Sequence, residues 1–505
     1  MPRLFLVILS LAALVLIFSF GITRHYEIPK VWDVERIHSM HLPFPDTSVH
    51  INPVSEEYYY QLPERVAYKS YPFYMPGKEP KGYFDWLRQQ QPEIIFNADN
   101  IKTEEDWIKA GEIVYDLPEL YEPIDSTYLA ELPELAKHWS KFIPVTKDGA
   151  IPFLSIVVRQ KGKIELGSRS CGMCHTKVMP DGELLKGGQG NFIFTQYLVS
   201  LQKVQRDFLK VPDSVIRKDI KTINRLIAEA PWIKHESQER LNNLSIEEWQ
   251  NIFVTRQGVL HRPGVSLGYP VNLPDLFNLK DRKYLDRTGH LQQRDITDLM
   301  RYATFNQSAA KLDDFNGFTP GNRPADPKKG NVVRFSDAQL YALAQYLYSL
   351  KTPKNPVSYP ADLIARGEVI FKDQDCVNCH TPPFYSNNKL SPVEGFEPPK
   401  DHLEKYHISD VSVGTDPTLA LYTRKATGYY KIPSLIGVWN RTAFLHGGYL
   451  ANLEDMFDPK RLDANYIPTG YKPPWLKTMA VKGHKFGLEL NEKDKTALLA
   501  FLRSL

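Results

Sequence analysis

Two segments far apart in the chain share one pattern of hydrophobic and polar positions. In residues 335–350 and 490–505 the apolar side chains recur every three or four positions, which places them on one face of a helix. Ser336 and Asn491 stand where a side chain accepts hydrogen bonds from the first free amides of a helix. The chain therefore predicts two amphipathic helices of one design, as an internal duplication produces. Aligned without gaps, the segments agree at Ala342/Ala497, Leu343/Leu498, Leu347/Leu502, Ser349/Ser504 and Leu350/Leu505.

A shorter pattern also occurs twice. Residues 273–282 and 432–441 both read apolar-Pro-x-Leu-x-x-apolar-x-x-Arg, with the proline at Pro274 and Pro433. A chance likeness between two proline-containing turns is the alternative reading. Because the pattern precedes each amphipathic helix in the same order, we interpret it as part of the same duplication.

The chain begins with an apolar run from Leu4 to Ile22 that only small residues interrupt. Its length is close to the ~20 residues that span a bilayer as a helix. No small-x-small cleavage site of the kind that ends a secretory signal follows it. We therefore predict an uncleaved signal-anchor in residues 1–25, with a cleaved signal peptide as the alternative.

Proline content and the helix pattern set the remaining boundaries. Residues 351–360 carry three prolines, as a stiff linker does. We predict a Tyr/Pro-rich, irregular extension in residues 26–150, a first helical domain in 151–355 and a second in 358–505. Within the extension, Thr103 followed by three acidic residues predicts a helix that opens with a capping box.

Composition narrows the class of partner. A chain with 42% hydrophobic and 24% charged residues is globular. Its net charge of +3 gives no strong field, which argues against a nucleic-acid partner and fits at most a weakly acidic protein.

All four cysteines fall in two Cys-x-x-Cys pairs, each followed at once by a histidine. A disulfide, a thioredoxin-like redox pair or a zinc site would each use such cysteines, but none explains the adjacent histidine. Covalent haem attachment does, because the thiols add to the porphyrin and the imidazole ligates iron. The sequence thus predicts two covalently bound haem c groups, attached on the periplasmic side in bacteria. The predicted haem residues are Cys171, Cys174, His175, Cys376, Cys379 and His380.

The run from Tyr430 through Arg441 and His446 to Asp455 is similar to the Pro-Ser-Leu…His-x-Gly…Thr-Leu-Glu signature of the bacterial di-haem cytochrome c peroxidase superfamily. That superfamily includes the methylamine-utilisation di-haem enzymes and the di-haem rubber oxygenases. The resemblance covers roughly residues 150–505. It implies a mainly α fold with two class I cytochrome c-like helical haem domains in tandem. It also implies that peroxide or dioxygen reacts at the N-terminal haem while the C-terminal haem passes electrons.

The loop before the second amphipathic helix offers a sixth iron ligand for the second haem. It contains Met479 and His484, and Gly483 lets the backbone approach the haem closely. The rubber oxygenases resemble this stretch and use a late histidine on their C-terminal haem. We predict His484 as the ligand, with Met479 and His446 as alternatives. His484 as a surface residue and His446 as a structural residue near a haem propionate are the competing readings.

The first haem lacks an equivalent ligand in the sequence. Lys329 stands as far before Ser336 as His484 stands before Asn491. No methionine or histidine occurs between Met300 and the second motif. An iron with a free sixth position can bind peroxide or dioxygen, although Lys329, His290 and Met300 remain candidates to close it. Glutamates follow the first motif, but no feature marks one of them as a proton donor, and no catalytic acid or base is predicted. They are Glu183, Glu236 and Glu239.

Three functions fit these residues. In the first, a periplasmic or membrane electron-donor protein reduces the His380 haem, and peroxide or a similar oxidant is reduced at the His175 haem. In the second, both irons are six-coordinate and the chain only carries electrons. In the third, the chain is an oxygenase of an apolar substrate.

Overall fold

The computed structural model describes residues 26–505 apart from 236–238, 308–310 and 331. The predicted signal-anchor in residues 1–25 lies outside the described residues. None of the described helices is both long and apolar enough to cross a bilayer.

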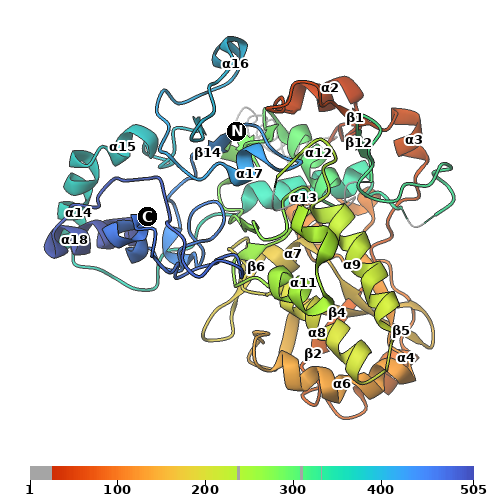
Figure 1. The fold of residues 1–505 in the computed structure, drawn as a ribbon. Coiled ribbons are helices and arrows are strands. Elements are labelled where there is room, and N and C mark those ends of the chain that lie inside the picture. The colour runs from red at the N-terminus through yellow and green to blue at the C-terminus, as the bar shows by residue number, and fades with distance from the viewer. Residues whose placement is uncertain (1–25, 236–238, 308–310, 331) are drawn as a thin grey trace, which may run out of the picture.

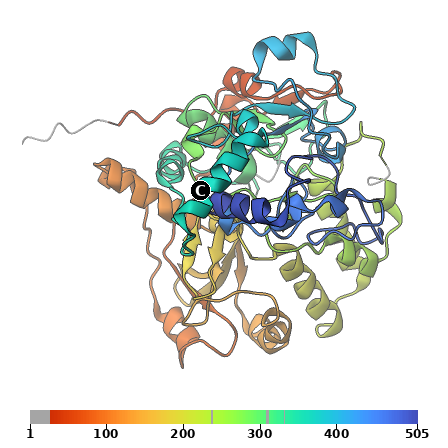
Figure 2. The same ribbon diagram turned by 90° about the vertical axis from the view of Figure 1, so that its left-hand side faces the viewer.

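Two pairs of crossing helices form the centres of the duplicated units (Figure 1). In the first, α5 (Glu104–Asp116) packs on α13 (Asp337–Ser349), and in the second, α14 (Ala361–Asp373) packs on α18 (Glu492–Ser504). Both crossings require glycine, since a Cβ on Gly111 would overlap the carbonyl oxygen of Ala342 and one on Gly367 that of Ala497. Figure 2 views the second unit face on.

The predicted helix starts are confirmed. The Ser336 side chain accepts from the amide of Gln339, and Asn491 accepts from that of Asp494. Thr103 and Asp106 form the predicted capping box of α5. This helix, placed within the extension by the sequence, is therefore the structural counterpart of α14.

The second repeated pattern is also reproduced in the backbone. The short helices η3 (Leu279–Asp281) and η4 (Val438–Asn440) occupy matching places. Three pairs of residues with positive φ accompany these helices. The two members of every pair are the same number of positions apart in the chain, as expected for a duplication. They are Asn278/Gly437, Asp286/Leu445 and Gly289/Gly448. The duplication inferred from the sequence thus extends to backbone conformation.

The two units exchange contacts reciprocally. The first contributes the strand pair β8 (Val259–Leu260) and β9 (Val271–Asn272), and the second contributes β13 (Leu390–Pro392) and β14 (Tyr429–Lys431). The Asn272 amide donates to the carbonyl of His446 (2.8 Å), and the Lys431 amide donates to that of Arg287 (3.1 Å).

The packing of the turns follows the same exchange. Gly448 of the second unit lies against Val259 of the first, and Gly289 of the first lies against Leu390 of the second. Each unit thus packs its turn on the strand pair of the other.

A four-stranded antiparallel sheet forms before the first Cys-x-x-Cys-His motif, and three of its strands lie between α5 and that motif in the sequence. Its order is β2 (Ser70–Tyr74), β4 (Ala150–Gln160), β5 (Lys163–Ser168) and β3 (Leu120–Pro123). Its hydrophobic side chains pack with those of α6 (Ser126–Trp139) and α8 (Phe194–Asp207).

This sheet corrects the fold class predicted from the sequence. With 37% helix and 13% strand, the fold is mixed rather than mainly α. The predicted boundary between residues 150 and 151 falls inside β4, which pairs with β2 from the predicted extension. The extension is therefore structurally continuous with the first unit.

The remaining elements are shorter or peripheral. β1 pairs with β12, which joins the N-terminal part of the described chain to the first unit, and β6 pairs with β7 and β10 with β11. The bounds of these elements are α2 (Val34–Met40), β1 (Ile51–Pro53), α3 (Glu56–Gln61), α4 (Tyr83–Gln89), η1 (Ala98–Asn100), α7 (Cys171–His175), β6 (Thr176–Val178), β7 (Leu184–Lys186), α9 (Asp213–Ile227), η2 (Arg240–Asn243), α11 (Ile246–Phe253), β10 (Tyr284–Leu285), β11 (Leu291–Gln292), α12 (Ile296–Gln307), β12 (Asp313–Phe315), α15 (Cys376–Cys379), α16 (Lys400–Lys405), α17 (Thr418–Leu421), η5 (Glu454–Phe457) and η6 (Pro459–Leu462).

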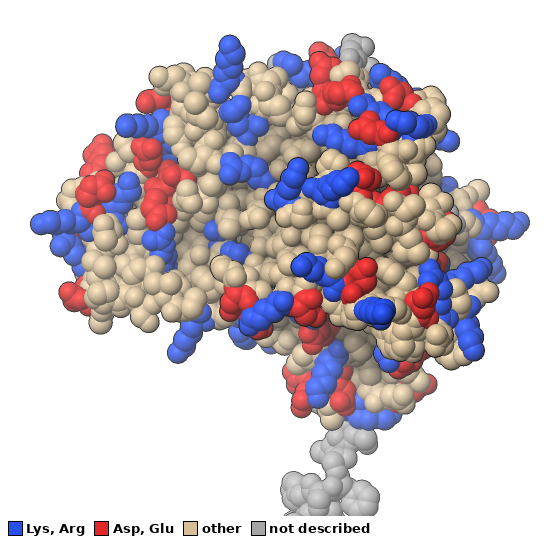
Figure 3. Space-filling model, turned by 90° about the horizontal axis from the view of Figure 1, so that it is seen from below, with Lys and Arg blue, Asp and Glu red and all other residues tan. Residues whose placement is uncertain are grey.

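Charged side chains are interspersed over the face seen in Figure 3, where lysines and arginines alternate with acidic residues. This distribution agrees with the weak field expected from the net charge.

Candidate haem sites

The first Cys-x-x-Cys-His motif forms the short helix α7, whose N-cap Ser170 accepts from the Met173 amide (3.2 Å). Nδ1 of His175 lies 3.0 Å from the carbonyl oxygen of Pro274. Because a carbonyl only accepts, this contact places the proton on Nδ1 and leaves Nε2 free to bind a metal.

The second motif repeats this arrangement. Nδ1 of His380 lies 3.2 Å from the carbonyl oxygen of Tyr385. Burial lowers the pKa of this ring, and the backbones of Tyr385 and, to a smaller extent, Pro433 oppose that effect. Pro274 and Pro433 hold the same place in the repeated pattern. The repeated pattern therefore supplies the backbone acceptor of His175, whereas Tyr385 supplies that of His380.

His484 faces His380 across a partly open cavity that both residues line together with Cys376 and Cys379. The two ring centres lie 6.4 Å apart. Two imidazoles that each bind one ion at about 2 Å have ring centres roughly 6 Å apart, so the spacing suits a shared iron. Burial lowers the pKa of His380 and of His484 to about 4, which keeps both rings in the neutral form that ligates metals.

The loop that carries His484 is held by a buried arginine that the sequence analysis missed. Arg461 is fully buried and donates to the carbonyls of Val481 (2.7 Å), Gly483 (2.9 Å) and His484 (2.6 Å). Gly483 and His484 have φ of 82° and 50°, a left-handed turn that favours glycine at the first of them. Arg461 thereby fixes a backbone conformation that is unfavourable for His484 by itself.

The two alternative ligands lie differently. Met479 is half-buried and packs against the hydrophobic core of the second unit. His446 lines the cavity, but its ring stacks on Tyr430 with centres 4.3 Å apart. Its Nε2 is 3.7 Å from Asp416, too far for a hydrogen bond, and neither ring nitrogen has a partner among the described residues.

The first site shows no matching arrangement. Among the described residues, no imidazole faces His175 as His484 faces His380. The Lys329 side chain is 86% exposed and lies near Asp326, and the Met300 side chain is buried in the hydrophobic core. His290 lines a cavity with His41, Arg262 and Lys425.

The two motifs differ in their exposure. Gly172, Met173 and Thr176 of the first are buried, whereas Asn378 and Thr381 of the second are exposed. Figure 1 likewise places α15 at the outer edge of the molecule and α7 in its interior.

Positive charge gathers between the two sites. Arg287 and Lys431 line a cavity of about 440 Å³ together with Pro274 and Pro433. Neither side chain forms an ion pair with a described residue, and burial lowers the pKa of Arg287 to about 9 and that of Lys431 well below its usual range. Uncompensated buried cations need anions, and haem carries propionate carboxylates. The residues therefore fit haem groups at both motifs.

The glutamates named from the sequence stay unassigned. Glu183 is exposed and pairs with Lys147 (2.7 Å), Glu239 is exposed, and Glu236 lies outside the described residues. A different carboxylate, Glu119, carries a perturbed pKa. No motif marks it in the sequence, since only folding brings it to the first pair of cysteines.

Burial raises the pKa of Glu119 to about 7, against the opposing effect of Arg65. Burial also raises the pKa of Cys171 and Cys174, and the charge of Glu119 adds to this effect. The folded protein thus favours the protonated acid, and this stabilisation is lost as pH rises from about 4.5 through 7. Glu119→Gln, which mimics the protonated form, is expected to raise the free energy of unfolding by about 1–2 kcal/mol at pH 8 and little at pH 4.5. Urea unfolding at both pH values measures this, with Glu183→Gln as the exposed control. Equal gains at both pH values would contradict the assignment.

No family model and no curated protein matches this chain. The solved structures that resemble it include the following three. They are hydrazine synthase of Kuenenia stuttgartiensis (15% identity over 57% of this chain and 87% of that one, TM-score 0.28), a MauG-like protein associated with microbial copper homeostasis (16%, 46% and 73%, TM-score 0.29), and the diheme peroxidase of Burkholderia thailandensis (12%, 88% and 94%, TM-score 0.28).

With TM-scores below 0.3, these three likenesses carry no argument about the superfamily, the electron path or the substrate of this chain.

Proposed function

We propose that this chain is a di-haem c-type oxidoreductase in which electrons enter at the second haem and reduce peroxide or a similar oxidant at the first. The observation that supports it most is the difference between the sites. His484 faces His380 at the spacing of a shared iron, and no described imidazole does so for His175.

The haem-binding residues would have different roles. His175 and His380, each oriented through Nδ1, would hold one haem iron apiece from below, and His484 would close the second iron to exogenous ligands. A haem iron with a free sixth position supplies the binding and reduction of peroxide. The Cys171 and Cys376 motifs would attach the two haems covalently.

The exposure of the second motif supports electron entry there. Electrons cross short distances between a donor and an acceptor, so a partner protein needs a cofactor near the surface. Asn378 and Thr381 are exposed beside Cys379, whereas Gly172, Met173 and Thr176 of the first motif are buried. We propose a periplasmic or membrane electron donor as the partner, and residues 1–25 as the anchor that holds the chain at the periplasmic face of the inner membrane.

Spectra of the purified holoprotein test the proposal. The oxidised protein is expected to show one high-spin and one low-spin ferric EPR signal, and the reduced protein to bind one carbon monoxide per two haems. Two low-spin signals without carbon monoxide binding would instead identify an electron carrier. Turnover of dioxygen with an apolar polymer, in the absence of peroxide turnover, would identify an oxygenase.

A further inference from the structure

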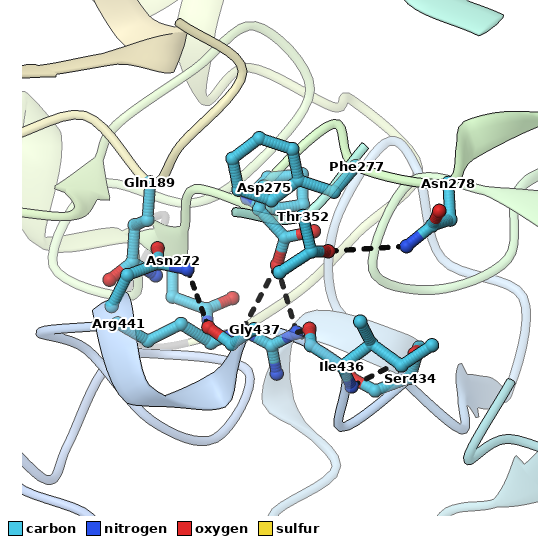
Figure 4. A network of polar contacts seen from close by, with 12 residues as sticks. Gln189, Asn272, Asp275, Phe277, Asn278, Thr352, Ser434, Ile436, Gly437 and Arg441 are labelled. Atoms are coloured by element: carbon cyan, nitrogen blue, oxygen red, sulfur yellow. Dashed lines mark hydrogen bonds and ion pairs between the residues drawn. The ribbon is translucent and has the colours of Figure 1, made fainter. Parts of the chain in front are cut away.

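One carboxylate lies between the loops that orient the two histidines. Oδ1 of Asp275 is 2.6 Å from Arg282, and Oδ2 is 2.8 Å from Arg441. These arginines hold equivalent places in the repeated pattern, one in each unit. Figure 4 shows Asp275 and Arg441 in this network.

Asp275 is linked to the first histidine through the residue that precedes it. The preceding residue, Pro274, supplies the carbonyl that accepts from Nδ1 of His175. Arg282 clamps the same turn by donating to the carbonyls of Asp275 (2.9 Å) and Phe277 (2.8 Å). A change at Asp275 therefore acts on the backbone that orients His175.

Arg441 carries the link to the second histidine. It donates to the carbonyls of Ser434 (2.8 Å) and Ile436 (3.3 Å), clamping the turn that follows Pro433. Within that turn the Leu435 amide donates to the carbonyl of Tyr385 (3.2 Å), which is also 3.2 Å from Nδ1 of His380. Hydrogen bonds and covalent bonds thus connect His175 with His380 through Asp275 and Arg441.

The charges of Asp275 and Arg441 act on the pKa of His175 and of His380, respectively. Burial lowers the pKa of His175 to about 4, and among the smaller effects Asp275 raises this pKa. Burial likewise lowers the pKa of His380 to about 4, and Arg441 lowers it further.

The duplication is broken at this point. Ser434 stands in the second unit where Asp275 stands in the first, although both arginines are kept. The two units therefore share a single carboxylate instead of having one each.

We propose that Asp275 is a positioning residue whose charge, paired with Arg441, acts on the redox potentials of both haem sites. This inference rests on the proposed function and deepens it. In each transfer, the iron at His380 loses one electron and the iron at His175 gains it. A negative charge between the sites favours the oxidised, more positive iron at both, and the Arg441 cation opposes it.

Redox titration of the full-length holoprotein tests the proposal, with each haem followed by its own EPR and absorption signal. Asp275→Asn is expected to raise both midpoint potentials, and Arg441→Gln to lower both. A tenfold change in the one-electron equilibrium corresponds to about 59 mV, and we expect a change of this order. Asp281→Asn, which removes an exposed carboxylate from the same segment, is expected to leave both potentials unchanged.

Opposite shifts distinguish a charge effect from a structural one. If both variants merely loosen the sites and admit water, their potentials move in the same direction, and the proposal is wrong. A shift at one haem alone would also contradict the proposal that this charge acts on both sites. Arg441→Lys keeps the charge and is expected to shift the potentials less than Arg441→Gln, which preserves a test if a neutral variant fails to fold. A six-coordinate first haem would contradict the proposed function while leaving these shifts measurable.

Discussion

Replacing His484 with alanine is expected to abolish the low-spin ferric signal of the second haem and to let carbon monoxide bind at both haems after reduction. In the structure this ring lies 6.4 Å from His380, centre to centre, across the cavity between them. Alanine leaves the iron with a single protein ligand, because His446 is stacked on Tyr430 and Met479 packs against the core. EPR and carbon monoxide titration of the variant measure the change.

Met479→Ala is the matched control, since it comes from the same loop and should keep the low-spin signal. Added imidazole should restore that signal to His484→Ala, because a free ligand can occupy the vacated position. Retention of the signal in His484→Ala together with its loss in Met479→Ala would reverse the assignment.

Replacing Gly367 with valine is expected to destabilise the protein by about 3 kcal/mol, because the new side chain would collide with the carbonyl of Ala497 where α14 crosses α18. Gly111→Val should act equally strongly at the crossing of α5 and α13, where Ala342 is the obstacle. Urea unfolding and the yield of soluble, haem-loaded protein measure both effects.

Ala365→Val provides the control for helix propensity, since Ala365 lies on the exposed side of α14. It is expected to cost well under 1 kcal/mol. Similar losses in Ala365→Val and Gly367→Val would show that the close approach of the helices is unimportant.

The local parts of this structure could be predicted from the sequence. Helix caps at Ser336, Asn491 and Thr103 depend on a few neighbouring residues, and the structure confirms all three. The position of His484 opposite His380 also agrees with the loop pattern, although its role as a ligand stays a prediction.

The opening helix of the first unit was missed because the sheet separates α5 from its motif. In the second unit α14 ends at Asp373, immediately before Cys376. A usable signal existed, since Gly111 and Gly367 are each followed four positions later by an aromatic residue, Tyr115 or Phe371. Such a pattern gains meaning only when the facing helix is known.

The convergence of Arg282 and Arg441 on Asp275 could not be read from the chain either. It depends on how the two units pack, and the sequence pattern gives the arginines without their shared partner. Arg461 was missed for the same reason, because its partners are backbone carbonyls of residues 481–484 and no side-chain pattern encodes them.

The reciprocal packing of the turns on β8–β9 and β13–β14 has the form of a domain-swapped dimer contained in one polypeptide. Cutting the linker at residues 351–360 would then leave two fragments held together by noncovalent contacts, and would not release two independent cytochromes. Each fragment alone would expose the surface on which the other unit's turn packs. The two haem sites are therefore expected to unfold in a single cooperative transition.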